Sequence, residues 1–249
     1  MSWSKFHSMR KHSIISILIV IIACCGDSTS KYSGPHQFGE LSSLAEGKTD
    51  KAMDAHGFTE IYEHIFYPLK NKPVKILEIG IGKGGSLALW QEYFPNANIY
   101  GIDINNRSHL DSERIHTFVA DQADRNQLKS FITKYGGGFD IIIDDSGHKM
   151  EQQQISFGYI FRYVKPGGYY IIEDVHTSFP DLYVDFGVEE DEKNTTFQLL
   201  KNFMRNATIE SQYLTPDEND YLTKHIEYCQ LTFRNNRHHS TVCIFKKRE

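Results

Sequence analysis

Short apolar stretches alternate with amphipathic ones along most of this chain, and that alternation limits the fold more than any other feature. Strand-like stretches lie at residues 74–79, 98–103, 115–119, 139–144 and 169–173, and helical spacing of apolar residues marks 85–94, 125–135 and 151–164. The stretch 139–144 is almost continuous isoleucine, which is typical of a strand buried on both faces. The pattern therefore predicts an α/β fold, with a mostly parallel sheet and helices on both of its faces.

Segments on either side of this region complete the predicted domain. Helices are expected at 54–69 and 196–206, and two closing strands at 225–233 and 240–246 flank a polar turn, which predicts an antiparallel pair. The acidic segment 179–194 predicts a solvated loop or a mobile lid. The 249 residues suit one large domain, so we place that domain at 49–249 and a linker at 31–48.

The charge balance argues against a nucleic-acid partner. Lys and Arg number 27 against 32 Asp and Glu, which gives a net charge of −5, whereas nucleic-acid binders usually carry a basic surplus. With 40% hydrophobic residues, the composition is also unlike that of a disordered chain.

The first 30 residues have the pattern of a signal-like or anchoring leader. A basic stretch precedes an apolar run of about 12 residues at 14–25, which is shorter than the roughly 20 residues of a membrane-spanning helix. Ile21-Ile-Ala-Cys24 also resembles a bacterial lipobox. The alternatives are an uncleaved anchor and a start codon placed too far upstream.

Two cysteines, Cys229 and Cys243, fall on the predicted closing strands. They are equally far from residue 236 in the turn, so they could face each other across the pair. The alternative, which we favour, is two half-buried thiols that do not pair.

A glycine-rich loop follows the first predicted strand, in the sequence Glu78-Ile-Gly80-Ile-Gly82-Lys-Gly84-Gly85. Glycines permit a tight turn and let a ligand approach the backbone closely. The spacing also fits the dinucleotide fingerprint. Glu78, two positions before the first glycine, is ill suited to a pyrophosphate but suits a ligand with a cationic amino-acid group.

Polar residues end the next two predicted strands as well. Asp103 can accept hydrogen bonds from ribose hydroxyls, and Asp121-Gln122 can reach an adenine. The alternative for each of these three residues is that it is a loop residue or a helix cap. Because ligands of open α/β sheets bind at the carboxyl ends of the strands, we expect these residues to share one site with the glycine loop.

Paired acids end the fourth and fifth predicted strands, in Asp144-Asp145-Ser-Gly-His148 and Glu173-Asp174. Carboxylates this close repel one another, and a bound divalent cation is the simplest resolution. Oxygen ligands favour a hard ion such as Mg²⁺. The alternative is solvated acids or helix caps. His148 has a side chain suited to take a proton from a hydroxyl near neutral pH.

Together these residues resemble the class I S-adenosylmethionine-dependent methyltransferases. The resemblance rests on Glu78, Gly80, Gly82, Asp103, Asp121 and Gln122. It implies S-adenosylmethionine as the cofactor, and a Rossmann-like seven-stranded sheet whose last strand is inserted antiparallel. Ser86 and Asp144 complete the predicted cofactor contacts.

A narrower resemblance brings in an earlier stretch of the chain. Lys48-Thr-Asp-Lys51, His56 and Thr59-Glu-Ile-Tyr62, taken with the glycine loop and the acidic motifs, look like the macrolide sugar O-methyltransferases of mycinamicin and macrocin type. In that group the counterparts of three acids hold Mg²⁺: Asp145, Glu173 and Asp174. The counterpart of His148 is the proposed base, so we predict His148 and Asp145 as catalytic residues.

The sequence thus predicts a Mg²⁺-dependent O-methyltransferase acting on a hydroxyl, with a sugar on a small molecule or a glycan as the acceptor. Two alternatives stay open: a hydroxylase of cephalosporin type, and a membrane-tethered binding protein without turnover. A membrane tether and a homo-oligomer also stay open. Since S-adenosylmethionine is made in the cytosol, we expect a cytoplasmic enzyme, with export or lipoprotein processing at Cys24 as the alternative.

Overall fold

The structure is a computed structural model that describes residues 39–249. The predicted leader at 1–30 and residues 31–38 of the predicted linker lie outside these residues. Among the residues described, no helix combines the length and the apolar character needed to cross a membrane.

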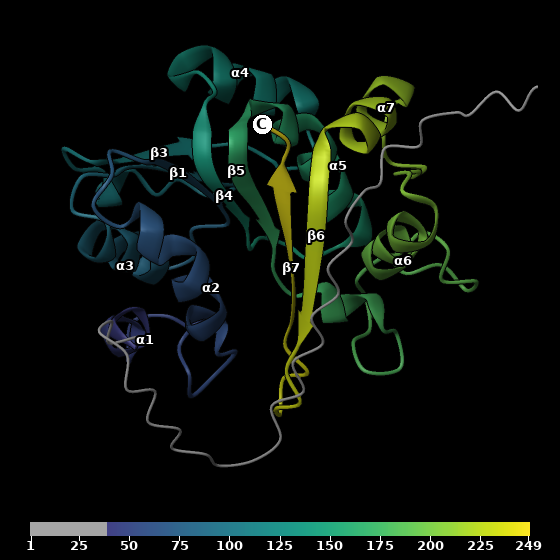
Figure 1. Ribbon diagram of the computed structural model, residues 1–249, viewed down its shortest axis with the longest axis horizontal. Coiled ribbons are helices and arrows are strands. Elements are labelled where there is room, and N and C mark those ends of the chain that lie inside the picture. The colour runs from purple at the N-terminus through teal and green to yellow at the C-terminus, as the bar shows by residue number, and fades with distance from the viewer. Residues whose placement is uncertain (1–38) are drawn as a thin grey trace, which may run out of the picture.

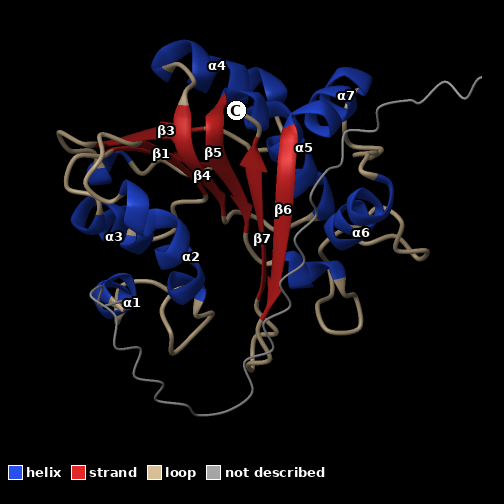
Figure 2. Cartoon of the chain, in the orientation of Figure 1, coloured by secondary structure: helices blue, strands red, loops and turns tan. Residues whose placement is uncertain are grey.

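Seven strands form one sheet at the centre of the molecule (Figure 1, Figure 2). They are β1 (Lys75–Ile79), β2 (Asn98–Asp103), β3 (Ile115–Val119), β4 (Phe139–Asp144), β5 (Val164–Ile172), β6 (Ile226–Phe233) and β7 (Thr241–Lys247). Their order is β3-β2-β1-β4-β5-β7-β6. Neighbours among β1 to β5 pair in parallel, whereas β7 is antiparallel to both β5 and β6. The predicted fold is therefore confirmed, including the inserted antiparallel last strand.

Helices cover both faces of this sheet. They are α1 (Glu40–Ala45), α2 (Phe58–Phe66), α3 (Gly85–Tyr93), α4 (Arg125–Tyr135), α5 (Met150–Ile160), α6 (Thr196–Asn206) and α7 (Pro216–His225). Short 3-10 helices are η1 (Tyr67–Leu69), η2 (Ser108–Leu110), η3 (Phe161–Tyr163) and η4 (Val175–Ser178). The first three α-helices lie together on one face, and α4 to α7 lie on the other (Figure 1).

Burial of both faces of the sheet explains why a central strand such as β4 is apolar at successive positions. Ile141 and Ile143 of β4 pack in the core beneath α1 to α3, whereas Ile142 packs in the core beneath α4 to α7. Successive side chains of a strand point to opposite faces, so a strand covered on both sides needs apolar residues at every position.

Helix α1 corrects the boundary of the predicted linker at 31–48, because it packs as part of the domain. Leu41 and Ala45 are fully buried in the same core as α2 and α3. The carboxylate of Glu63, on α2, accepts hydrogen bonds from the N–H groups of Gly39, Glu40 and Leu41 at 2.6, 3.1 and 3.2 Å. These groups would otherwise lack partners at a helix start, so a distant residue stabilises a helix that six residues alone do not specify.

Helix α7 was also absent from the prediction, although its start carries a clear signal. Thr215 accepts the N–H of Glu218, and the Glu218 carboxylate accepts the N–H of Thr215, which together form a capping box. Pro216 occupies the first turn, where a missing N–H costs nothing. The sequence did not predict this helix because it is mostly polar, and only Glu218 and Leu222 of it are buried.

The two cysteines are buried and free, as favoured, but the predicted register between them is wrong. Cys229 lies opposite Phe245, and Cys243 lies opposite Leu231. The pairing is centred on residue 237 rather than 236, which places the thiols diagonally across the two strands.

Candidate active site

The carboxyl ends of β1, β4 and β5 meet at one edge of the sheet and bring the predicted acids together. Asp144 pairs with Ile79 of β1 and with Ile172 of β5. Beyond the strand ends, the Asp145 N–H donates to the carbonyl of Ile79 at 2.8 Å, and the Glu173 N–H donates to the carbonyl of Asp144 at 3.0 Å. The ladder thus continues for one more residue and fixes Asp145 and Glu173 side by side.

Two glycines permit close packing at this edge. Gly80 has a φ of +94°, and a Cβ there would lie 2.0 Å from the carbonyl oxygen of Asp145. A Cβ at Gly85 would lie 1.9 Å from the carbonyl oxygen of Lys48. The glycine loop therefore supports β4 on one side and the segment 48–51 on the other.

Asp103 braces the glycine loop from the end of β2. Its carboxylate accepts the N–H groups of Ile81 at 3.2 Å and Gly82 at 3.1 Å, and that of Asn105 at 2.7 Å. Burial alone raises the pKa of Asp103, but these donors and Arg107 outweigh it and lower the pKa, so the group is ionised. Its predicted contact with ribose hydroxyls stays a prediction.

A cavity of about 460 Å³ opens over the glycine loop. Five predicted site residues line it, namely Gly80, Gly82, Ser86, Asp145 and His148, together with Lys48, Thr49 and Asp50. This volume is in the range of small-molecule sites. A second cavity, of about 430 Å³, lies at the opposite edge of the sheet and is lined by residues that include Asp140, Gly168 and Glu249.

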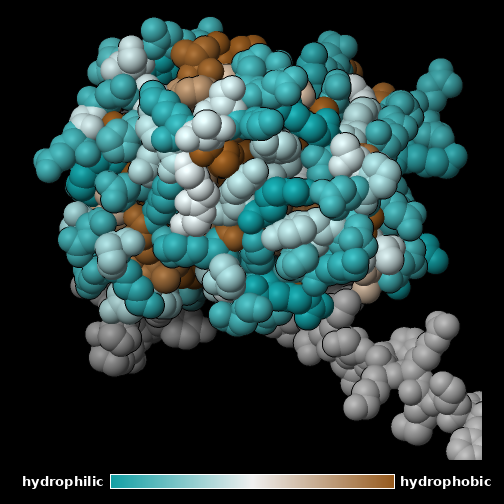
Figure 3. All heavy atoms as spheres, turned by 90° about the horizontal axis from the view of Figure 1, so that it is seen from above, coloured by the Kyte–Doolittle hydropathy of each residue, from teal (hydrophilic) through white to brown (hydrophobic). Residues whose placement is uncertain are grey.

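The first cavity is the candidate site because it lies at the carboxyl ends of the strands, beside the acids. The opposite edge is the side that carries the C-terminus, at the top of Figure 1. Seen from that side, the surface is mostly hydrophilic, with small and separate hydrophobic patches (Figure 3).

Glu78 lies behind the cavity and is fully buried. The indole N–H of Trp90 donates to Glu78 Oε2 at 3.0 Å, while Glu78 Oε1 has no hydrogen-bond partner among the residues described. Burial raises the pKa of Glu78 to about 7, against the opposing charge of Lys51. Its predicted contact with the cofactor's amino group stays a prediction.

Asp144 and Gln122 lie beneath the edge on the side of α5. The hydroxyls of Ser156 and Tyr170 donate to Asp144 Oδ2, the latter at 3.0 Å, and the Gln122 amide lies 3.4 Å from Asp144 Oδ1. Burial raises the pKa of Asp144 to about 7. Asp121 accepts the N–H of Ala123 at 2.8 Å. These residues do not line the cavity, and their predicted contacts with the cofactor stay predictions.

Lys51 is the site residue that the prediction missed. Its side chain is fully buried, and its ammonium donates to Asp145 and, at 2.9 Å, to Glu173 Oε2. Glu78 Oε1 lies 3.5 Å away. Burial alone lowers the pKa of Lys51, but the three carboxylates outweigh it and hold the pKa well above its ordinary value. The charged lysine therefore compensates the negative charge of the acids, whereas the sequence predicted only a metal ion in this role.

Tyr62 supports the same cluster from α2. Its hydroxyl donates to Glu173 Oε1 at 2.6 Å, so both oxygens of the Glu173 carboxylate accept a hydrogen bond. Lys51 and Tyr62 both come from the stretch that carried the narrower family resemblance. That stretch was the signal by which Lys51 could have been found.

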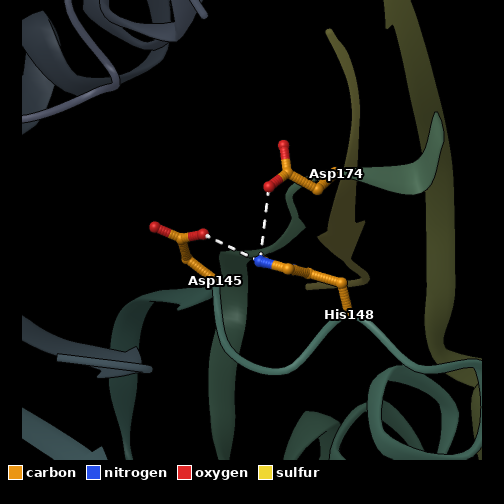
Figure 4. A group of neighbouring side chains, drawn as sticks. All are labelled: Asp145, His148 and Asp174. Atoms are coloured by element: carbon orange, nitrogen blue, oxygen red, sulfur yellow. Dashed lines mark ion pairs between the residues drawn. The ribbon is translucent and has the colours of Figure 1, made fainter. Parts of the chain in front are cut away.

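His148 lies between two carboxylates (Figure 4). Its Nε2 is 3.8 Å from Asp145 Oδ1 and 3.4 Å from Asp174 Oδ2. Burial lowers the pKa of His148, against the opposing charge of Asp145, so the ring is neutral near pH 7 and can accept a proton. Both His148 and Asp174 have a φ of +54°. Such backbone strain in non-glycine residues is typical of functional sites.

The donor chemistry fits a hard divalent cation. Asp145, His148 and Asp174 each offer one ligand atom, and these atoms lie within 4.8 Å of one another. Asp174 Oδ1 is buried and has no hydrogen-bond partner among the described residues. Glu173 is adjacent, but Lys51 and Tyr62 occupy its oxygens. The structure thus groups two of the three predicted metal ligands with His148, the predicted base, while the third, Glu173, accepts hydrogen bonds from an ammonium and a hydroxyl.

Comparison with known proteins agrees with this geometry. The family described as "Methyltransferase domain" matches residues 70–225, which is more than half of the chain. The chain belongs to this methyltransferase family. The matched region begins just before β1 and ends with α7, so it includes the glycine loop and both acidic motifs.

Individual members of the methyltransferase family are similar to this chain as well. It is 38% identical to an 8-demethyl-8-(2-methoxy-alpha-L-rhamnosyl)-tetracenomycin-C 3'-O-methyltransferase of Streptomyces olivaceus, over 72% of this chain and 47% of that protein. It is 37% identical to the mycinamicin VI 2''-O-methyltransferase of Micromonospora griseorubida, over 80% of this chain and 49% of that protein.

A solved structure is similar over most of the chain. The MycE methyltransferase from the mycinamycin biosynthetic pathway, in complex with Mg, SAH and mycinamycin VI, superposes with a TM-score of 0.68 at 32% identity, over 84% of this chain and 54% of that one. The chain spans about half the length of the relatives that it matches.

Proposed function

We propose that this methyltransferase moves a methyl group from S-adenosylmethionine to a sugar hydroxyl of a small molecule, with the help of Mg²⁺. The observation that carries the proposal is the cavity over the glycine loop, which is bordered by Asp145 and His148 of the acidic cluster. A methyl donor in the cavity is thereby close to a base. Relatives named for methylation of sugar-bearing antibiotics support the choice of acceptor.

Residues of four strand ends would hold the cofactor. The loop at Gly80 and Gly82 and the start of α3 at Ser86 form the floor of the cavity. Glu78 and Asp103 would supply negative charge for the amino group and the ribose, and Asp121, Gln122 and Asp144 would contact the adenine. This chain's main contribution to the rate is to align the sulfonium methyl with the acceptor oxygen.

The acidic cluster prepares the acceptor. Asp145, Glu173 and Asp174 would hold Mg²⁺, which lowers the pKa of a bound hydroxyl and orients it. His148 Nε2 accepts the hydroxyl proton as the oxygen–methyl bond forms and the methyl–sulfur bond breaks, leaving S-adenosylhomocysteine. The nearby carboxylates of Asp145 and Asp174 stabilise the imidazolium that results.

The test measures S-adenosylhomocysteine release with a panel of deoxysugar glycosides. His148→Ala should keep its affinity for S-adenosylmethionine and lose turnover, and His225→Ala, at the end of α7, serves as the matched control. Equal loss of cofactor affinity and turnover would show that His148 is structural. Asp145→Asn should reduce the dependence on Mg²⁺, and full activity of the wild type in a chelator would remove the metal from the mechanism.

We further propose that the protein works in the cytoplasm, where its methyl donor is made. The leader, with its lipobox-like Cys24, lies outside the described residues, so anchoring or export stays a prediction. A homo-oligomer also stays a prediction.

A further inference from the structure

A lysine ammonium occupies the space between two of the proposed metal ligands. Lys51 Nζ donates to Asp145 Oδ2 and lies 2.9 Å from Glu173 Oε2, and its side chain has no exposed surface. A divalent cation bound by the same two carboxylates would lie within a few ångströms of this ammonium. Two cations this close, beside a fully buried lysine side chain, repel strongly.

The structure also offers the ammonium a second partner. Glu78 Oε1 lies 3.5 Å from Lys51 Nζ, is buried, and has no hydrogen-bond partner among the described residues. Trp90 already satisfies the other oxygen of this carboxylate. A small movement of the side chain would therefore give Glu78 the donor that it lacks, while the ammonium stays charged and buried.

The main chain of Lys51 is fixed, so the side chain is the part that moves. The Lys51 carbonyl accepts the N–H of Thr59 at 3.2 Å, and the Lys51 N–H lies 3.4 Å from Thr49 Oγ1. Close packing of Lys48 on Gly85 holds the start of the same segment. Only the flexible lysine stem links this anchored backbone to the acids.

We propose that Lys51 is a built-in counter-ion that a divalent cation displaces from Asp145 and Glu173 toward Glu78. The inference rests on the proposed function, because it takes these acids as the metal ligands. Without metal, Lys51 keeps the carboxylates together and compensated. With metal and without the cofactor, it transfers to Glu78 and frees the oxygens that coordinate the ion. Lys51 is thus a positioning residue that competes with the metal.

The test titrates Mn²⁺ into the full chain by calorimetry, without cofactor. Lys51→Met removes the competing charge and should bind Mn²⁺ at least tenfold more tightly than the wild type. Lys70→Met makes the same charge change at an exposed pair with Glu40 and should bind like the wild type. Equal or weaker binding by Lys51→Met would overturn the proposal.

A second variant carries the test if Lys51→Met does not fold. Lys51→Arg keeps a cation for the acids but can hold one carboxylate through two parallel N–H donors of a planar fork, which the single ammonium of lysine cannot do. It should therefore resist displacement and bind Mn²⁺ at least fivefold more weakly. Unchanged affinity would contradict displacement while leaving the metal site intact. No Mn²⁺ binding by any of the proteins, wild type included, would instead reject the metal in the proposed function, and this inference with it.

Discussion

Gly85→Ala tests whether the segment 48–51 depends on the start of α3. The added Cβ would lie 1.9 Å from the carbonyl oxygen of Lys48. An ordinary contact is about 3.5 Å, so either the segment or the helix must shift by about 1.5 Å. Overpacking against a backbone atom costs about 1–3 kcal/mol of unfolding free energy, which corresponds to a fall in melting temperature of roughly 2–12 °C for a chain of this size.

The same shift should weaken cofactor binding. Lys48, Thr49 and Asp50 line the cavity, so moving them by about 1.5 Å alters one wall of the site. We expect the affinity for S-adenosylmethionine, measured by calorimetry, to fall by about tenfold, which is equivalent to ~1.4 kcal/mol.

Gly158→Ala is the matched control for Gly85→Ala. Gly158 also lies in a helix, but an added Cβ meets the side-chain ends of Leu214 and Glu218 rather than the backbone, and Gly158 does not line the cavity. It should melt near the wild-type temperature and bind the cofactor normally. The reasoning would be refuted if Gly85→Ala melted within about one degree of the wild type and bound the cofactor with unchanged affinity.

Three further predictions concern the stability of the fold. Tyr62→Phe removes the hydroxyl that donates to Glu173 at 2.6 Å, and without divalent cations it should cost about 1–3 kcal/mol in denaturant unfolding; no loss would mean that this hydrogen bond is dispensable. Phe157→Ala removes a fully buried ring stacked 4.5 Å from that of Phe245 and should cost about 3–5 kcal/mol; a cost under about 1 kcal/mol would contradict the packing. The pKa of Glu218 is lowered because Arg125 and the cap at Thr215 outweigh the effect of burial, so its stabilisation is complete above the unfolded-state pKa of about 4.3 and is lost as the pH falls through the lower native value. Glu218→Gln should therefore unfold with a smaller loss of stability between about pH 5 and pH 3 than the wild type, and parallel curves would argue against it.

The order of the strands and helices could be predicted from the sequence because each central element is long enough to show its own hydrophobic period. The strands at 98–103, 115–119 and 139–144 and the helix at 125–135 match the structure residue for residue. Local sequence patterns did not predict elements whose stability depends on residues far away in the chain. Helix α1 depends on Glu63, which is 22 residues or more further along the chain.

The site was predicted in outline, since the residues at the ends of parallel strands necessarily meet. Asp145, Glu173 and Asp174 come together because of strand register, which a strand–helix alternation implies. Lys51 does not lie at a strand end, so strand register gave no signal for it, and only the resemblance through residues 48–51 pointed to this segment. It is a lone lysine in a polar segment, and its partners lie 94 and 122 residues away. Repulsion among the acids predicted a positive charge nearby but did not distinguish a metal ion from an ammonium.

Binding of S-adenosylmethionine to the full chain, followed by calorimetry with and without Mg²⁺, tests the central claim most directly. The account predicts micromolar affinity that is lost in Glu78→Ala, which removes the carboxylate assigned to the cofactor's amino group. No binding under either condition would contradict it, whatever the acceptor proves to be.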